Sequence, residues 1–157
     1  MKFTRPNGGT VEFHNAAAEV MSRCRQLSRR DSEAGGMILG RLVVESNDLV
    51  IDEATQPSKR DRKGRFFFIR RRRAAQCRVN QAWLGSNGTR NYLGEWHSHP
   101  EDNPTPSDID IENWCRIGAE ARYEQDFLLF AIVGRERTRL WELAKFGGDL
   151  TELESQR

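Results

Sequence analysis

The sequence contains the stretch Glu95-Trp96-His97-Ser98-His99-Pro100, which Ser107 and Asp110 follow a few residues later. The apolar run that leads into it predicts a strand, in which residues two apart project from the same face. His97 and His99 are therefore expected to direct their imidazole rings at one point. Ser107 predicts the start of a helix, which places Asp110 in the first turn. Two imidazoles and one carboxylate suit Zn(II) and leave its fourth position for water, as in a catalytic site.

Two histidines close together also occur without a metal, as hydrogen-bonding residues at the end of a strand. The longer pattern is more specific, because it adds a serine and an aspartate at a defined spacing. It also contains two of the three histidines in the chain, since only His14 lies elsewhere. We therefore interpret the stretch as a candidate metal site.

A second element lies upstream, where Glu33 precedes Ala34-Gly35-Gly36-Met37-Ile38-Leu39-Gly40. Residues 37–44 predict a strand, although glycine weakens a strand unless a backbone or a ligand must come close. A close approach of this kind fits a site at which Glu33 reaches a metal-bound water. Taken alone, Glu33 would be interpreted as a solvated carboxylate in a loop.

Together these elements, which span residues 33 to 110, resemble the JAMM motif of the MPN-plus (JAB domain) family of zinc peptidases. That family cuts isopeptide or peptide bonds at the C-terminus of ubiquitin and ubiquitin-like proteins. The resemblance implies that Glu33 is the general base and that His97, His99 and Asp110 bind one zinc ion per chain. It further implies that Ser107 supports the tetrahedral intermediate. A protein substrate with an extended C-terminal tail is the expected partner.

The segment Gly94-Glu95-Trp96-His97-Ser98-His99-Pro100 also looks like that of bacterial JAMM proteins encoded beside ubiquitin-transfer-like enzymes. Among these are the deconjugating peptidases of type II CBASS antiphage operons, which release a nucleotidyltransferase (CD-NTase) joined through its C-terminus to target proteins. Bacterial operons that conjugate a true ubiquitin-like protein carry a similar peptidase, and the sequence leaves both alternatives open. A non-catalytic MPN scaffold is a third alternative, although such scaffolds lose motif residues that this chain keeps.

The composition indicates a polar chain of 157 residues with 31% charged and 37% hydrophobic residues, for which we expect a single domain over 1–157. No apolar run approaches the roughly 20 residues of a membrane span, and the first residues lack the apolar core of a signal peptide. The three cysteines are widely spaced, which favours reduced thiols and a cytoplasmic location. We expect Cys24 to pack in the core.

One segment concentrates positive charge, although the net charge is only +2. The segment from Lys59 to Arg73 has nine basic residues and one acid, Asp61. A basic run at a helix N-terminus opposes the helix dipole, which suggests an acidic protein surface or tail as a partner. A solvated loop is the alternative. The candidate substrate-binding residues are Lys59, Arg60, Arg62 and Lys63. We do not expect a nucleic-acid partner, because no aromatic residues are interleaved in the exposed part for base stacking.

The remaining pattern predicts an α/β fold, in which a mixed β-sheet carries packed helices, as in an MPN/JAB-like domain. Capping explains Ser107 and Asp108 at the start of the third helix without requiring Asp110. The expected elements are a hairpin over 1–13, a helix over 16–29, strands over 37–44 and 49–55, an exposed loop over 56–65, a short buried strand over 66–69, a helix over 74–84, the metal-bearing strand over 91–97, a helix from 107, a central strand over 127–133, its partner over 139–143 and a polar tail over 147–157.

Overall fold

The computed structural model describes residues 1–59, 61–65 and 67–156. Nine strands form one sheet in the order β10-β9-β8-β7-β3-β4-β2-β1-β11. The pairs β2/β4 and β7/β8 are parallel, and the other pairs of this sheet are antiparallel, so the sheet is mixed. Its strands are β1 (Lys2–Thr4), β2 (Thr10–Phe13), β3 (Gly35–Leu42), β4 (Leu49–Ala54), β7 (Asn91–Ser98), β8 (Phe127–Val133), β9 (Thr138–Ala144), β10 (Leu150–Glu152) and β11 (Glu154–Gln156).

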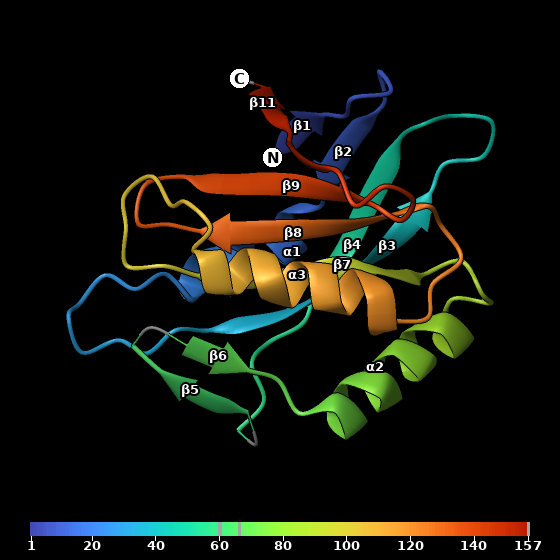
Figure 1. The fold of residues 1–157 in the computed structure, drawn as a ribbon. Helices are drawn as coiled ribbons and strands as arrows, with labels where there is room; N and C mark the ends of the chain where they lie inside the picture. Colours follow the sequence, from blue (N-terminus) through green and yellow to red (C-terminus); the bar gives the residue numbers. More distant parts are fainter. Residues whose placement is uncertain (60, 66, 157) are drawn as a thin grey trace.

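Three helices cover the sheet within the part of the chain that the structure describes: α1 (Asn15–Arg23), α2 (Arg72–Gly85) and α3 (Asp108–Glu120). Figure 1 shows α3 and α2 in front of the sheet and α1 behind it. No helix among the described residues is both long enough and apolar enough to cross a membrane. The predicted α/β class with a mixed sheet is confirmed.

Strand β8 is the centre of the core, because each of its side chains is buried. Leu129, Ala131 and Val133 pack on the α1 side, together with Ala17 and Met21 of that helix. The alternate residues of β8, which include Phe130, pack on the α3 side against Trp114. A strand that is buried on both faces was predicted from its unbroken apolar run, and this prediction is confirmed.

The segment from residue 150 to 156 connects the two edges of the sheet, where the sequence predicted only a polar tail. β10 pairs with β9 at one edge and β11 pairs with β1 at the other. Leu153 lies between these strands and is buried, and its N–H donates to the Leu140 carbonyl at 2.8 Å. Two strands of three residues each, separated by one buried leucine, form too short a pattern to predict from the sequence.

The first helix is shorter than the predicted span of 16–29, because α1 ends at Arg23. Local hydrogen bonds take the place of helical ones in the residues that follow. The Ser28 N–H donates to the Asp31 carboxylate at 2.7 Å, and the Gln26 side chain donates to the Asp31 carbonyl at 3.2 Å. Side chains that bond to nearby backbone groups in this way compete with a helix.

The predicted exposed loop over 56–65 is wrong in its second half. Residues Arg62–Gly64 form β5, which pairs with β6 (Phe67–Ile69) as a separate two-stranded sheet. This β5–β6 hairpin lies beside the main sheet, below α3 in Figure 1. Of the predicted buried strand over 66–69, residue 66 lies outside the described residues and the rest forms β6 of this hairpin, in which Phe68 is only half-buried. The exposed basic side chains of β5 show no alternation of apolar and polar residues, so the strand could not be predicted.

Candidate metal centre

The histidine pair lies where β7 ends. His97 is opposite Gly35 of β3, and the next residue in the register, Trp96, is opposite Gly36. The His99 N–H donates to the Val133 carbonyl at 3.0 Å, which holds the chain extended just beyond β7. A side chain at Gly35 would collide with the Phe68 ring, at 2.6 Å from its Cδ1 atom. The glycine thus permits the hairpin to approach the strand; the sequence predicted a close approach for this segment, but for Glu33 and a metal-bound water rather than for a hairpin.

The carboxylate comes from the opposite side, at the start of α3. Ser107 is the N-cap, and its Oγ accepts a hydrogen bond from the Asp110 N–H at 3.2 Å. The Asp110 carboxylate in turn accepts from the Ser107 N–H at 2.7 Å and from the Ser107 hydroxyl at 2.6 Å. This is a capping box. The expectation that capping leaves Asp110 unexplained is therefore wrong, because the box fixes the orientation of this carboxylate.

Four polar side chains converge at this point. The Nε2 atoms of His97 and His99 are 3.0 Å apart. The Asp110 carboxylate lies 3.2 Å from the His97 Nε2 and 3.4 Å from the His99 Nε2. The Glu33 carboxylate is farther from the same two atoms, at 3.8 Å and 4.0 Å.

These distances allow a test of whether the residues fit a metal ion. Ligand atoms that bind a tetrahedral Zn(II) at about 2.0–2.1 Å lie roughly 3.3–3.4 Å from one another. The Nε2–Nε2 distance and the two distances to the Asp110 carboxylate have this length to within a few tenths of an ångström, with Oδ1 nearest His97 and Oδ2 nearest His99. Glu33 is also a possible ligand, because its carboxylate and the ring nitrogens of the two histidines all lie within 4.8 Å of one another. We favour Asp110 as the third ligand, since its oxygens are closer to both imidazoles.

Glu33 is buried, at 5% exposure, and belongs to the loop that leads into β3. Its own N–H donates to the Gly64 carbonyl of the hairpin at 2.7 Å. Burial raises the pKa of the Glu33 carboxyl to about 7; the nearby His99 opposes this rise and the Asp110 charge adds to it. The carboxyl is therefore able to exchange its proton near neutral pH.

The pKa values of the Asp110 carboxyl and of the His99 imidazole shift in opposite directions. Burial by itself would raise the pKa of the Asp110 carboxyl, but hydrogen bonds with His97, His99 and Ser107 outweigh burial and hold this pKa well below its usual range. Burial would lower the pKa of His99, yet the hydrogen bond and charge of Asp110 outweigh it, aided by Glu33 and Glu101, and raise this pKa. Asp110 is thus a permanent anion at physiological pH.

The four side chains open into a pocket of about 460 Å³. Ser107 lies at this pocket, and Trp114 and Phe68 supply apolar walls. The Arg70 guanidinium, paired with Glu95, closes one side. Of the predicted substrate-binding residues, Arg60 lies outside the described residues. Lys59, Arg62 and Lys63 are exposed on or before β5 and do not line this pocket.

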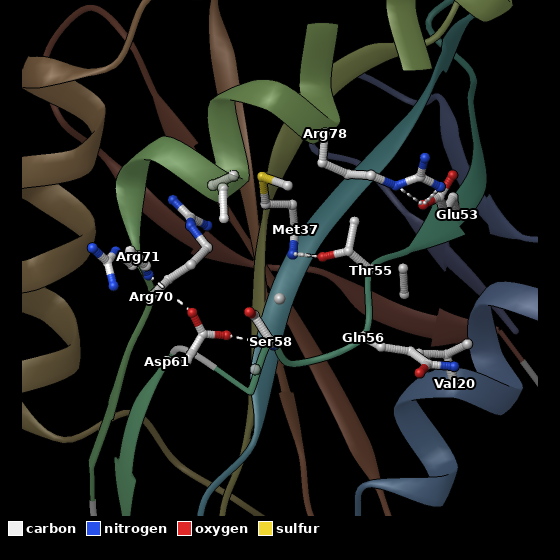
Figure 2. A pocket seen from close by; sticks show the side chains of 15 residues that line it. Val20, Met37, Glu53, Thr55, Gln56, Ser58, Asp61, Arg70, Arg71 and Arg78 are labelled. Carbon is white, nitrogen blue, oxygen red and sulfur yellow. Dashed lines mark hydrogen bonds and ion pairs between the residues drawn. The ribbon is translucent and has the colours of Figure 1, made fainter. Parts of the chain in front are cut away.

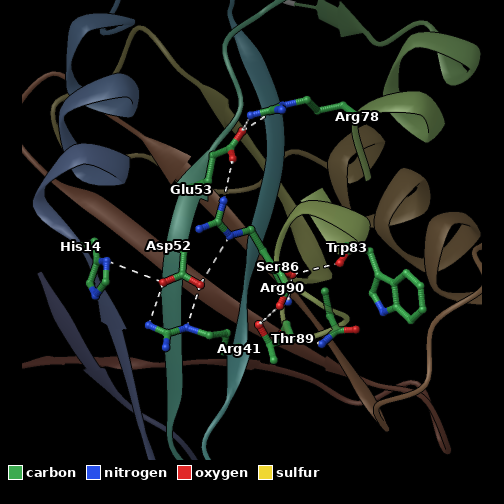
Figure 3. A network of polar contacts seen from close by, with 10 residues as sticks. His14, Arg41, Asp52, Glu53, Arg78, Trp83, Ser86, Thr89 and Arg90 are labelled. Carbon is green, nitrogen blue, oxygen red and sulfur yellow. Dashed lines mark hydrogen bonds and ion pairs between the residues drawn. The ribbon is translucent and has the colours of Figure 1, made fainter. Parts of the chain in front are cut away.

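Two further polar regions lie outside the pocket. A cavity of about 490 Å³ between β4 and α2 shares Arg70 with it, and Figure 2 shows the Arg70 side chain at the wall of this cavity. Figure 3 shows Asp52, which accepts two hydrogen bonds of 2.9 Å from Arg41 and so joins β4 to β3. These ion pairs are interpreted as structural.

Two buried polar residues beside the site, Ser98 and Gln26, have no role predicted from the sequence; they are 0% and 2% exposed. The Ser98 hydroxyl donates to the Gln26 Oε1 at 3.2 Å and accepts from the Ala34 N–H at 3.0 Å. Strand alternation alone indicates that Ser98 faces away from the two imidazoles. Nothing in the sequence indicates its partner.

Comparisons with known proteins identify the family of the chain. Residues 17–144 match the family described as prokaryotic homologs of the JAB domain. A Pseudomonas aeruginosa protein named CD-NTase/cGAS isopeptidase is 37% identical over 82% of this chain and 80% of its own length. Proteins of the same name from Escherichia coli and Vibrio cholerae are 35% and 38% identical, over 88% and 71% of this chain and 86% and 68% of their own lengths.

A solved structure supports the fold. The solution structure of a Desulfitobacterium hafniense protein superposes with a TM-score of 0.62 at 20% identity, over 92% of this chain and 90% of that one. The family match covers most of the chain and includes the residues of the candidate metal centre. The chain therefore belongs to the prokaryotic homologs of the JAB domain.

Proposed function

We propose that this protein is a metal-dependent isopeptidase that hydrolyses the bond between the C-terminus of a CD-NTase and a target protein. The observation that carries the proposal is the convergence of Glu33, His97, His99 and Asp110 from three separate parts of the chain into one pocket. Convergence of an anionic ligand, two imidazoles and a carboxyl of raised pKa is typical of a hydrolytic centre.

His97, His99 and Asp110 would hold one Zn(II) ion, because their donor atoms have the separations that such an ion requires. When bound, Zn(II) supplies a Lewis acid and lowers the pKa of a bound water toward about 7. The protein contributes rigidity: Asp110 is held by the helix cap, and His97 packs beside Trp114 with ring centroids 6.1 Å apart.

Glu33 is proposed as the general base and acid. It accepts a proton from the attacking water and returns it to the leaving amine, so that the carbonyl carbon gains an oxygen and the C–N bond breaks. A carboxyl with a pKa of about 7 can do both near neutral pH. Its position 3.8 and 4.0 Å from the two imidazoles supports this role rather than that of a ligand.

Ser107 is proposed to stabilise the developing oxyanion, as the resemblance implies. Its hydroxyl lines the pocket but donates to the Asp110 carboxylate at 2.6 Å. To reach a substrate oxygen, the hydroxyl must therefore rotate away from Asp110. Until it does so, Ser107 orients the carboxylate of the proposed ligand.

The names of the relatives and the limited access to the pocket support the proposed substrate class. The isopeptidase relatives are named for CD-NTase/cGAS, which favours a CD-NTase over a ubiquitin-like protein as the conjugated partner. The four reactive groups have side chains no more than 16% exposed, so only an extended segment can bring its carbonyl among them. A C-terminal tail provides such a segment.

The test is cleavage of a CD-NTase whose natural C-terminal tail is fused to a reporter protein. Wild-type protein with zinc is expected to release the reporter at the last residue of the tail, as measured by mass spectrometry. A parallel fusion that carries a scrambled tail is the control. If only a fusion to a ubiquitin-like protein were cleaved, the result would favour the peptidase of a ubiquitin-like conjugation operon. Zinc-loaded protein that cuts none of these fusions would contradict the proposal.

A further inference from the structure

We propose that Gln26 and Ser98 are positioning residues of the metal centre, linked in one buried chain of hydrogen bonds that fixes Glu33 relative to the two histidines. This inference rests on the proposed function. Neither residue lines the pocket. Their effect passes through the neighbours to which they are bonded.

Ser98 stands between the two proposed ligands. Because side chains alternate along β7, His97 faces α3 while Ser98 faces the opposite side of the sheet. A hydroxyl buried there needs partners, and it has two: it donates to the Gln26 Oε1 at 3.2 Å and accepts from the Ala34 N–H at 3.0 Å. The Ser98 N–H also donates to the Ala34 carbonyl at 2.8 Å. The residue after Glu33 is thus bonded twice to the residue between the histidines.

Gln26 extends this chain of bonds to the β5–β6 hairpin. Its Nε2 donates to the Asp31 carbonyl at 3.2 Å and to the Arg65 carbonyl at 3.1 Å. Two carbonyls require the amide nitrogen, and the Ser98 hydroxyl requires the amide oxygen. Only one orientation of the amide satisfies all three contacts. The side chain is 2% exposed, so each lost bond would leave a buried group without a partner.

The β5–β6 hairpin is also hydrogen-bonded directly to the backbone of Glu33. The residue before Arg65 in the chain, Gly64, accepts the Glu33 N–H at 2.7 Å. The backbone on both sides of the Glu33 side chain is therefore held, by Gly64 directly and by Ser98 through Ala34. Gln26 joins these two holding points, because it contacts both Arg65 and Ser98. A shift of the hairpin would alter the position of the Glu33 carboxyl relative to His97.

The test replaces Gln26 with methionine, which keeps the length of the side chain and removes its hydrogen bonds. Outer hydrogen-bond partners of metal ligands typically contribute 10- to 100-fold in activity or metal affinity. We expect Gln26→Met to reduce kcat on the reporter fusion by about 10-fold or more, with KM within about threefold of wild type. Gln81→Met, an exposed position on α2, is the matched control and is expected to keep both constants.

Amide hydrogen exchange provides a readout that needs neither substrate nor metal. In wild type, the Glu33 and Ala34 amides are expected to exchange slowly, since both donate within the folded protein. Gln26→Met should accelerate the exchange of both by about tenfold, whereas amides of β8 should be unaffected. Ser98→Ala is the second variant, in which Ala34 loses its acceptor and is expected to respond more strongly than Glu33.

The possible outcomes separate this inference from the proposed function. Unchanged kcat and unchanged exchange of the two amides in Gln26→Met would overturn it. If both variants failed to fold, rapid exchange of Ala34 in wild type would overturn it, and slow exchange would support the bond to Ser98. Lack of cleavage by wild type would reject the proposed function, while the exchange experiment would still decide the role of Gln26.

Discussion

Two carboxylates approach the same pair of imidazoles from different regions of the molecule, and their surroundings give them opposite properties. Glu33 comes from the loop before β3 and is buried with its carboxyl 3.8 Å or more from the ring nitrogens. Asp110 comes from the first turn of α3 and lies 3.2 Å and 3.4 Å from them. Burial raises the pKa of Glu33 to about 7, whereas hydrogen bonds hold the pKa of Asp110 far below its usual value.

The difference in pKa suits the two carboxyl groups to two different tasks, binding a cation and carrying a proton. A carboxylate that stays ionised is suited to bind a cation, and a carboxyl that titrates near neutrality is suited to carry a proton. Hydrogen bonds with His97, His99 and the Ser107 cap produce the first condition, and burial produces the second. The assignment of ligand and base therefore depends on the two environments, and substitutions can test each one separately.

The largest effect is expected for the ligand side of the comparison. His97→Ala, His99→Ala and Asp110→Ala should each lose the bound zinc, from about one ion per chain to nearly none, because a three-ligand site does not survive as two. Cleavage should fall to background. Elemental analysis measures this, with Asp108→Ala as the control from the same turn of α3. Equal zinc in wild type and in all three variants would reject the ligand assignment.

The next effect concerns the proton carrier. Glu33→Gln keeps the shape of the side chain but cannot accept a proton, so zinc content should be unchanged while cleavage falls by roughly 10² to 10⁴. The variant should still bind a conjugate and can serve as a trap. Rates are measured on the reporter fusion with enzyme matched for zinc. Near wild-type cleavage would transfer the role of base to Glu95 or Glu101, which lie beside the histidines in the sequence.

Glu33→Gln also tests the raised pKa of Glu33 through the stability of the protein, without an assay of catalysis. In the metal-free protein, Glu33 keeps its proton in the folded state at pH values where the unfolded chain has lost it. Its burial therefore costs stability increasingly as pH rises from about 4.5 to about 7, and the cost remains above that range. Glu33→Gln removes this cost, on the order of 1 to 3 kcal/mol. Urea unfolding at pH 4.5 and pH 8 measures it. An equal difference at both pH values would contradict the raised pKa.

The smallest effect is expected for charges that touch neither carboxylate. Reversal of Arg62 and Lys63 to glutamate should raise KM a few-fold at low salt while the zinc content is unchanged, because the exposed β5 strand presents positive charge to the substrate. The effect should disappear toward 1 M salt, where the Debye length is about 3 Å. Arg29→Glu with Arg30→Glu is the control of equal charge. An identical response in both pairs would identify a general effect of net charge.

The sequence predicted the elements whose patterns are long and regular, such as β8, and it predicted the convergence on one point of His97 and His99 from strand alternation. It could not predict the hairpin, because the exposed basic residues of β5 carry no alternation. It also missed Gln26, since a glutamine 72 residues from its partner Ser98 leaves no local signal. Asp110 was predicted as a ligand and stays a prediction, whereas its place in the capping box became clear only from the cap geometry.

The closing segment at residues 150–156 has a consequence for the synthesis of the protein on the ribosome. β1 is made first, yet its outer edge is covered only by β11, and the outer edge of β9 is covered only by β10. A chain from which residues up to 149 have emerged and folded therefore exposes both of these edges at once (Figure 1). Unpaired edges attract other strands, and the contacts between the two ends span almost the whole chain. Until these residues emerge, the nascent protein keeps two unpaired strand edges that can pair with other chains.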